Sequence, residues 1–191
     1  MEQVSEPWID LDCHPSTRAE IVRAIQVLVR RSANAELHIT FRLDGDIPLL
    51  RIPPPRAPQI GRELWRHTCF EAFIAVEGQS AYHEFNFAPS GEWCVYALSS
   101  YRNGSPLADE TMRPHIAMRS TGTRLELDAI VRLDILSDIY PWAVIRIGLS
   151  AVIEASDGTF SYWALRHPAD KPDFHNADGF ALRLEPPGPE Q

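Results

Sequence analysis

The sequence predicts an all-β protein: an antiparallel β-sandwich, jelly-roll or immunoglobulin-like, with about nine to ten strands and at most one or two short helices. Apolar residues recur at every second position in short segments, which is the period of a half-buried strand. Turn signals such as Asp44-Gly45 and Asn103-Gly104 separate these segments. Repeated strand–helix alternation and nucleotide-binding motifs are absent from the sequence, which excludes the common nucleotide-binding α/β folds.

Length and composition set the outer limits of the prediction. The 191 residues are enough for one domain with a sizeable core, and we expect that core over residues 10–184 with a flexible tail at 185–191. A formal net charge of −8 argues against a nucleic-acid partner, because phosphate binding needs clustered Lys and Arg. We expect a small-molecule ligand instead, and the oligomeric state stays open.

The start of the chain and its cysteines bear on location. Residues 1–12 are acidic and lack the apolar stretch of a signal peptide, and no apolar run approaches the roughly 20 residues of a membrane span. The three cysteines, Cys13, Cys69 and Cys94, show no CxxC spacing. These features predict a cytoplasmic, membrane-independent protein with reduced thiols.

The first third of the chain carries a mixed pattern. Residues 4–14 form a polar lead-in. A capping-box pattern opens residues 17–31, but their apolar residues then alternate, so we expect a helical or irregular start that passes into a strand. Residues 37–43 and 47–52 flank the Asp44-Gly45 turn and predict a hairpin. Three consecutive prolines, at 53–55, then end the sheet.

The later segments follow the same reasoning and are mostly hairpins joined by loops. A strand at 93–98 follows the turn at 89–91, residues 99–113 form a loop, and 115–119 pairs with 124–133. One helical turn is possible at 134–140. The remaining elements are a hairpin of 144–153 with 159–166, a Pro- and Asp-rich loop at 167–178, and a last strand at 180–184.

The chain is organised around a hairpin of residues 69–77 and 80–87. Gly78-Gln79 suits a type II′ turn, because glycine accepts the positive φ of the first central position. If residues 77 and 80 pair, Glu71 lies opposite Asn86. One face then carries six apolar side chains and His83, and the other carries a thiol, two carboxylates, an amide and a phenol: Cys69, Glu71, Tyr82, Glu84 and Asn86.

Several runs in and around this hairpin resemble bacterial DOMON-like proteins, which are similar to family-9 carbohydrate-binding modules. The runs are Leu64-Trp65, Thr68–Phe73, Tyr82–Trp93, Tyr101-Arg102, Ser161–Leu165 and Lys171–His175. The resemblance implies a β-sandwich that binds a small ligand, either a sugar or haem, without performing chemistry.

The sugar interpretation combines aromatic rings with planar polar groups. Aromatic faces stack on the C–H surface of a sugar, while carboxylates and amides bind its hydroxyls. The same tryptophans are also ordinary core residues in many proteins. The candidate ligand-binding residues are Trp65, Glu71, Tyr82, Glu84, Asn86, Arg102, Trp163 and Lys171.

Two further ligands are weighed against sugar. The alternative function is that of a haem-binding DOMON domain in electron transfer. Haem needs axial ligands, and no histidine or methionine of the chain matches an axial position of these relatives, so we expect no cofactor. His67, Cys69 and Glu71 would share one strand face and could bind a metal ion with Glu84 as fourth ligand. A single such run is weak evidence, and we assign no metal ligand, although Ca²⁺ on acidic loops stays open.

An enzymatic alternative uses the two central glutamates. Glu71 and Glu84 are diagonal neighbours on adjacent strands, at a spacing not far from that of retaining glycosidases. The sequence shows no nucleophile motif such as GxSxG. We therefore assign no catalytic residue and expect a non-catalytic binding domain.

Overall fold

The computed structural model of the protein describes residues 7–17 and 20–188, and over these residues it confirms the all-β prediction. The described chain has twelve strands, more than the nine or ten expected, and its helical content is limited to short 3-10 turns. The strands are β1 (Ile9–Cys13), β2 (Val22–Arg31), β3 (Glu36–Gly45), β4 (Cys69–Val76), β5 (Tyr82–Phe87), β6 (Trp93–Ser100), β7 (Asn103–Leu107), β8 (His115–Ser120), β9 (Arg124–Arg132), β10 (Ile145–Glu154), β11 (Phe160–Ala164) and β12 (Leu182–Leu184). The 3-10 turns are η1 (Ile47–Leu49), η2 (Leu64–Arg66), η3 (Glu110–Met112) and η4 (Ala177–Gly179).

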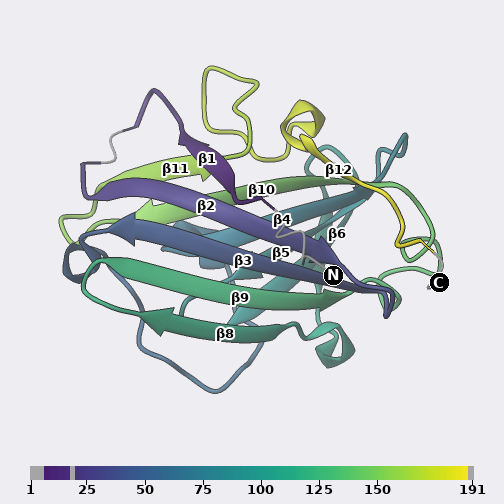
Figure 1. Ribbon diagram of the computed structural model, residues 1–191, viewed down its shortest axis with the longest axis horizontal. Coiled ribbons are helices and arrows are strands. Elements are labelled where there is room, and N and C mark those ends of the chain that lie inside the picture. The colour runs from purple at the N-terminus through teal and green to yellow at the C-terminus, as the bar shows by residue number, and fades with distance from the viewer. Residues whose placement is uncertain (1–6, 18–19, 189–191) are drawn as a thin grey trace, which may run out of the picture.

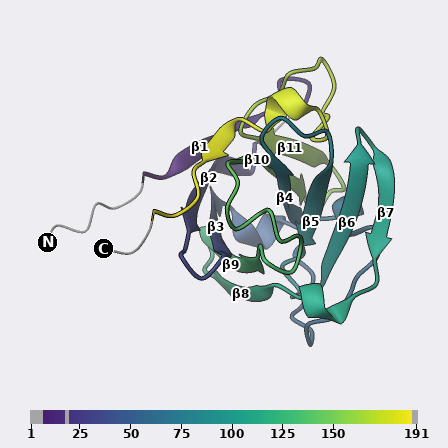
Figure 2. The same ribbon diagram turned by 90° about the vertical axis from the view of Figure 1, so that its right-hand side faces the viewer.

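The strands form two layers that face one another (Figures 1 and 2). Sheet A has the order β1-β2-β3-β9-β8, and sheet B has the order β7-β6-β5-β4-β10-β11, with β12 also paired to β10. Strand β1 joins the layers, because residues 9–11 pair with β2 while Asp12 and Cys13 pair with β11. The named strand pairs are all antiparallel, as expected for a sandwich.

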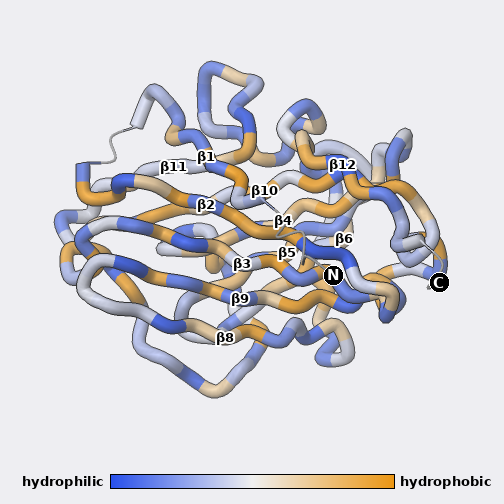
Figure 3. Tube along the Cα trace, in the orientation of Figure 1, coloured by the Kyte–Doolittle hydropathy of each residue, from blue (hydrophilic) through white to orange (hydrophobic). Residues whose placement is uncertain are grey.

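The core lies between the two sheets and is built from alternate residues of each strand. Figure 3 shows the alternation of hydrophobic and hydrophilic residues along β3 and β9. Sheet A supplies Phe41 and Leu127, and sheet B supplies Phe70, Phe85 and Ile147, all fully buried. This arrangement removes one face of each strand from water, which is the main stabilising contribution in a sandwich.

Strands β2 and β3 correct the expectation for the first third of the chain. Residues 22–31 form one long strand, which resolves the ambiguity of 17–31 in favour of β-structure, although Arg18 and Ala19 of the capping box lie outside the described residues. The hairpin predicted between 37–43 and 47–52 is wrong. Strand β3 pairs with β2 and β9 instead. Residues 47–49 form η1, because Pro48 has no N–H to donate to a ladder.

Two strands lie where the sequence predicted none. Strand β1 falls in the stretch interpreted as a polar lead-in, and β7 falls in the predicted loop at 99–113. Strand β7 is the edge of sheet B, and its side chains are mostly exposed, so it has no apolar alternation to detect. Residues 134–140 form hydrogen-bonded turns, not a helix.

Two further observations concern the chemistry of the whole chain. The three cysteines are free, as expected. Within residues 7–17 and 20–188, no helix has the length and apolar character needed to cross a membrane. Of the tail predicted at 185–191, residues 189–191 lie outside the described part.

Candidate functional site

The β4/β5 hairpin has the register that the sequence predicts. Glu71 pairs with Asn86, and Phe73 pairs with Glu84. The turn differs in detail, because the amide of Gln79 donates to the carbonyl of Val76 and Gly78, with a φ of 82°, occupies the third turn position. The strand pairing therefore survives a different turn type, which shows that the two faces of the hairpin determine its register.

The polar face of this hairpin continues across sheet B. Directly paired residues share a face, so the pairing extends the Glu84 row to Tyr96 on β6 and the Glu71 row to Ser150 on β10. On β11, Tyr162 pairs with Val152 and joins the same surface. This surface points away from the core between the sheets. We call it the pocket face of sheet B, after the pocket described below.

A long connection covers part of the pocket face. Residues 165–181, the covering loop, join β11 to β12 and form the yellow-green and yellow loops at the upper side of Figure 1. Phe180 from this loop stacks on Phe73 with ring centres 5.7 Å apart. Gly148 makes room for that ring, because a Cβ atom there would lie 2.7 Å from the Phe180 side chain. The covering loop therefore packs on sheet B through a second, smaller apolar cluster.

Between the covering loop and the strands lies a pocket of about 690 Å³. Its volume is within the range typical of small-molecule sites. Aromatic rings form much of its lining, and two carboxyl groups lie among them. The lining residues are Trp65, Arg66, Glu71, Phe73, Glu84, Tyr96, Leu98, Arg102, Gly104, Val152, Phe160, Tyr162, Pro172, Phe174 and His175.

Glu71 and Glu84 are buried within this lining, with 2% and 6% of their surfaces exposed. The hydroxyl of Ser150 donates to Glu71 Oε2 over 3.0 Å, and the amide of Asn86 donates to Glu84 Oε1 over 2.7 Å. Both donors are neutral. Asn86 is itself buried and does not line the pocket, so it orients Glu84 from beneath.

Burial shapes the protonation of the two acids. Removal from water, and secondarily the charge of Glu84, raises the pKa of Glu71 to about 8. Burial also raises the pKa of Glu84, against a smaller opposing effect of the Asn86 hydrogen bond. The pair therefore retains a proton at neutral pH, and a protonated carboxyl can donate a hydrogen bond as well as accept one.

A polar network closes one side of the pocket. Arg102 Nη2 donates to Asp173 Oδ1 over 3.0 Å, and the Tyr101 hydroxyl donates to the other oxygen of Asp173. His175 Nδ1 lies 2.8 Å from the Tyr82 hydroxyl, and its Nε2 lies 3.8 Å from Glu84. Strand β5 and the turn between β6 and β7 are thereby tied to the covering loop.

The structure brings most of the candidate residues together. Trp65, at η2, lines the pocket with 45% of its surface exposed, so it can stack on a ligand. Arg102 lines the pocket as well. Tyr82 is buried beneath the lining, where it supports His175. Two candidates lie elsewhere. Trp163 is in the core between the sheets with its indole N–H donated to Ser161, and Lys171 is an exposed residue of the covering loop outside the lining.

The position of Trp163 follows from strand parity. On β11, Phe160 and Tyr162 point to the pocket face, so the odd-numbered residues point to the core. Both faces of this strand carry aromatic residues, which leaves the sequence without a signal for the correct face. Sequence reasoning therefore chose Trp163 and missed Tyr162.

Other lining residues were missed for a different reason. Tyr96 reaches the pocket through the pairing of β6 with β5, and Phe174 and His175 reach it from an irregular loop. Ser150 does not line the pocket but supports Glu71 from β10. Counting outward from the hairpin would have found Tyr96, since β6 pairs directly with β5. No local pattern marks the other three.

The geometry does not support a metal site at the run of His67, Cys69 and Glu71. His67 ends η2 before β4 begins, and its Nδ1 lies 2.8 Å from Glu154 Oε2, so it does not share a strand face with Cys69 and Glu71. Within the described residues, no three His, Cys, Asp or Glu side chains gather as a metal site would require. Of the histidines weighed as haem ligands, His175 lines the pocket, whereas His83 is bonded to the Tyr140 hydroxyl.

Comparison with known proteins supports the fold. No protein-family model and no curated protein sequence matches the chain. Solved structures with the same fold include a candidate carbohydrate-binding protein from Bacteroides uniformis ATCC 8492, with a TM-score of 0.67 at 13% identity over 91% of this chain and 84% of that one. Two structures of a family-9 carbohydrate-binding module from Caldicellulosiruptor kristjanssonii also match. The complex with glucose has a TM-score of 0.52 at 10% identity, covering 86% of this chain and 78% of the module. The complex with cellotriose has a TM-score of 0.51 at 11% identity, covering 84% and 72%.

The chain shares its fold with carbohydrate-binding proteins. The predicted likeness to family-9 carbohydrate-binding modules is thus confirmed for the fold, and the DOMON-like assignment stays a prediction. At 10–13% identity the comparisons do not transfer individual site residues to this chain.

Proposed function

We propose that the protein is a non-catalytic carbohydrate-binding protein whose site is the pocket between sheet B and the covering loop. The observation that carries the proposal is the combination of rings and carboxyl groups in one pocket. Trp65, Phe160 and Tyr162 offer apolar faces for sugar C–H groups, while Glu71 and Glu84 offer hydrogen-bonding oxygens for hydroxyls. Similar folds that hold glucose and cellotriose support this proposal.

The roles within the site follow from the contacts. Trp65 acts as the stacking surface, because it is the most exposed of the aromatic residues that line the pocket. Ser150 and Asn86 hold the two carboxyl groups in place. Preorganised side chains lower the conformational entropy lost on binding, so these buried supports favour affinity. The proposed binding requires neither haem nor a metal ion.

Titration calorimetry with glucose and cellotriose tests the proposal. We expect saturable binding that weakens about tenfold or more in Trp65→Ala, since one aromatic stacking contact contributes on the order of 1–2 kcal/mol. Trp142→Ala is the matched control, because Trp142 is 79% exposed and lies outside the pocket lining. Absence of saccharide binding would contradict the proposal. So would an affinity of Trp65→Ala and Glu84→Gln equal to that of the Trp142→Ala control.

A second candidate function is glycoside hydrolysis. The raised pKa of Glu71 favours it, because a carboxyl protonated at neutral pH is what a general acid requires. Glu84 would then serve as nucleophile or base. Release of nitrophenol from nitrophenyl glycosides that disappears in Glu71→Gln would establish this activity. No release above that of the buffer would leave the site as a binding site.

A further inference from the structure

The charges around the pocket are unevenly compensated. Arg66 Nη2 lies 2.9 Å from Glu63, and Arg102 lies 3.0 Å from Asp173, so each lining guanidinium already has a carboxylate partner. Each of these two ion pairs is neutral overall. Glu71 and Glu84 have a hydroxyl and an amide as hydrogen-bond donors, and no arginine or lysine of the described residues is in direct contact with either carboxyl group.

The other titratable groups near the pair do not supply a positive charge. Burial, and secondarily Arg102, lowers the pKa of His175 to about 4, so its imidazole is neutral at neutral pH. Burial raises the pKa values of Cys69, Cys94, Tyr82 and Tyr96, so these groups carry no charge either. Arg102 acts on Glu71 and Glu84 from a distance, as a smaller opposing effect on their raised pKa values.

The walls of the pocket suit a cation. Six aromatic rings line it: Trp65, Phe73, Tyr96, Phe160, Tyr162 and Phe174. The face of an aromatic ring attracts a positive charge, and this attraction is larger in a pocket that excludes water. A neutral sugar would use the same rings for stacking, but only a cation can compensate the negative charge that the acid pair carries when it is ionised in this buried site.

We infer that the ligand of this pocket carries a positive charge, and that among carbohydrates the pocket selects sugars bearing a protonated amine. This inference rests on the proposed carbohydrate-binding function and names its ligand class. The ammonium group would lie against Glu71 and Glu84, with the sugar ring between the aromatic walls. Binding converts the acid pair into an ion pair, as a buried carboxylate requires.

Calorimetric titration with matched sugars tests the inference. The probes are glucosamine, glucose and N-acetylglucosamine, repeated with galactosamine and galactose so that the configuration at one hydroxyl does not decide the result. We expect at least one amino sugar to bind tenfold or more tightly than both its neutral parent and, for glucosamine, its acetylated form. Choline, a cation that is not a sugar, is titrated as a sixth probe.

Variants assign the preference to the two acids. Glu84→Gln and Glu71→Gln keep the shape of the site and are expected to reduce the amine preference, which is the ratio of the affinities for an amino sugar and its neutral parent, to less than threefold. Glu110→Gln makes the same change in net charge at an exposed residue of η3 and is expected to keep the preference. Persistence of the preference in both pocket variants would overturn the inference.

The outcomes separate this inference from the proposed function. Equal affinity for amino and neutral sugars would overturn the inference and leave carbohydrate binding intact. Binding of choline without binding of any sugar would uphold the cation and overturn the carbohydrate. No binding of any probe would overturn both.

The pH dependence gives an independent reading. Choline keeps its charge at every pH, so any change in its affinity comes from the protein. We expect its affinity to rise several-fold between pH 6 and pH 9, because the proton that the acid pair retains competes with the cation and is lost over this range. A flat profile, or one that falls with pH, would contradict a site built on this pair.

Discussion

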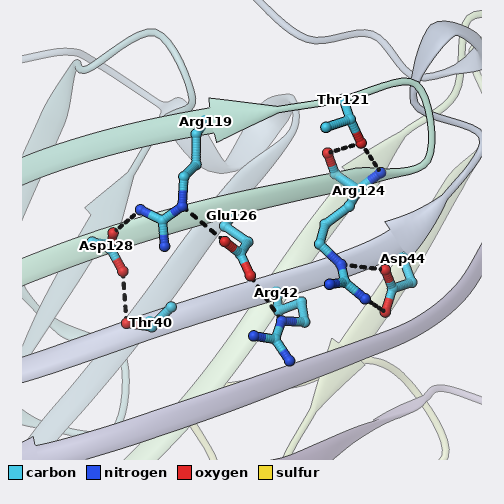
Figure 4. A network of polar contacts seen from close by, with 8 residues as sticks. All are labelled: Thr40, Arg42, Asp44, Arg119, Thr121, Arg124, Glu126 and Asp128. Carbon is cyan, nitrogen blue, oxygen red and sulfur yellow. Dashed lines mark hydrogen bonds and ion pairs between the residues drawn. The ribbon is translucent and has the colours of Figure 1, made fainter.

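The outward faces of the two sheets handle their acidic residues in opposite ways. On sheet A, Glu126 receives hydrogen bonds from Arg42 and Arg119, and Asp44 is held by Arg124 (Figure 4). On the pocket face of sheet B, the acids have a hydroxyl and an amide as partners. The acids of sheet A are satisfied within the protein, whereas those of sheet B remain available to a ligand.

The pKa directions express the same difference. The hydrogen bond from Arg124 lowers the pKa of Asp44, and the bonds from Arg42 and Arg119 lower the pKa of Glu126 against the opposing effect of its partial burial. Burial raises the pKa values of Glu71 and Glu84. A sandwich can thus carry ionised, ion-paired acids on the outward face of one sheet and buried acids that favour the protonated form on the outward face of the other.

The largest effect on the free energy of unfolding is expected from the packing of the covering loop, which only the outward face of sheet B has. Phe73 and Thr40 both point outward from interior strands, β4 and β3. Phe73→Ala removes a buried ring under the covering loop and should lower the free energy of unfolding by about 3–5 kcal/mol. Thr40→Ala loses one hydrogen bond to Asp128 and should cost about 0.5–1.5 kcal/mol.

Urea denaturation of the two variants measures this contrast. The denaturation midpoints should separate clearly, with Phe73→Ala the less stable. A small and equal loss in both would show that the covering loop contributes no more to stability than the solvated face of sheet A.

The next effect, the pH dependence of the free energy of unfolding, differs in sign between the acids of the two sheets. The pKa of Glu71 is near 8 in the folded protein and near 4.5 in an unfolded chain, so the folded state holds a proton that the unfolded state releases. The free energy of unfolding therefore falls as pH rises through this window. Glu71→Gln removes the penalty and should stabilise the protein by on the order of 1–3 kcal/mol at pH 9 and by little at pH 5.

Glu126→Gln is the counterpart on sheet A. Its lowered pKa means that the glutamate contributes stability above its unfolded pKa and loses it as pH falls. The variant should thus be slightly destabilised at pH 9, the opposite of Glu71→Gln. Thermal unfolding at pH 5, 7 and 9 checks both, and destabilisation by Glu71→Gln at pH 9 would show that its carboxylate is compensated after all.

How well the sequence predicts a strand depends on whether its two faces carry different kinds of side chain. The β4/β5 hairpin was predictable to the exact pair, because one face is apolar except for His83 and the other carries nearly all of the polar side chains. What the sequence does not reveal is that the polar face is buried. That burial comes from the covering loop, whose contacts with Phe73 and Gly148 join residues far apart in the sequence and follow no periodic pattern.

The same reasoning accounts for the errors. Strand β11 has apolar residues on both faces, so parity could not tell Trp163 from Tyr162. Strands β1 and β7 are short and carry few buried residues, so only their pairing partners define them. Apolar and polar residues alternate along a strand when one of its faces meets water. This alternation is lost when both faces are covered.

Glycine substitutions sharpen the comparison at an intermediate size. Gly148→Ala would place a Cβ atom 2.7 Å from the Phe180 ring and push the covering loop outward, at a cost of about 1–3 kcal/mol. Gly122, in the turn between β8 and β9 of sheet A, has open space at the same point, so Gly122→Ala should stay within about 0.5 kcal/mol. Thermal denaturation measures both, and equal effects would mean that the contact between loop and sheet is loose.

The smallest effect is expected from the charged surface itself. Arg119 bonds to Glu126 and Asp128, but more than half of its side chain is exposed, so water and salt screen its charge. Arg119→Met should lower the free energy of unfolding by no more than about 1 kcal/mol, and less still in 1 M NaCl. Urea denaturation at low and high salt is the measurement. A salt-independent loss of 2 kcal/mol or more would mean that the arginines of sheet A compensate buried charge. The acids of the two faces would then no longer differ in exposure. They would differ only in the source of the compensating cation, which is the protein on sheet A and the ligand on sheet B.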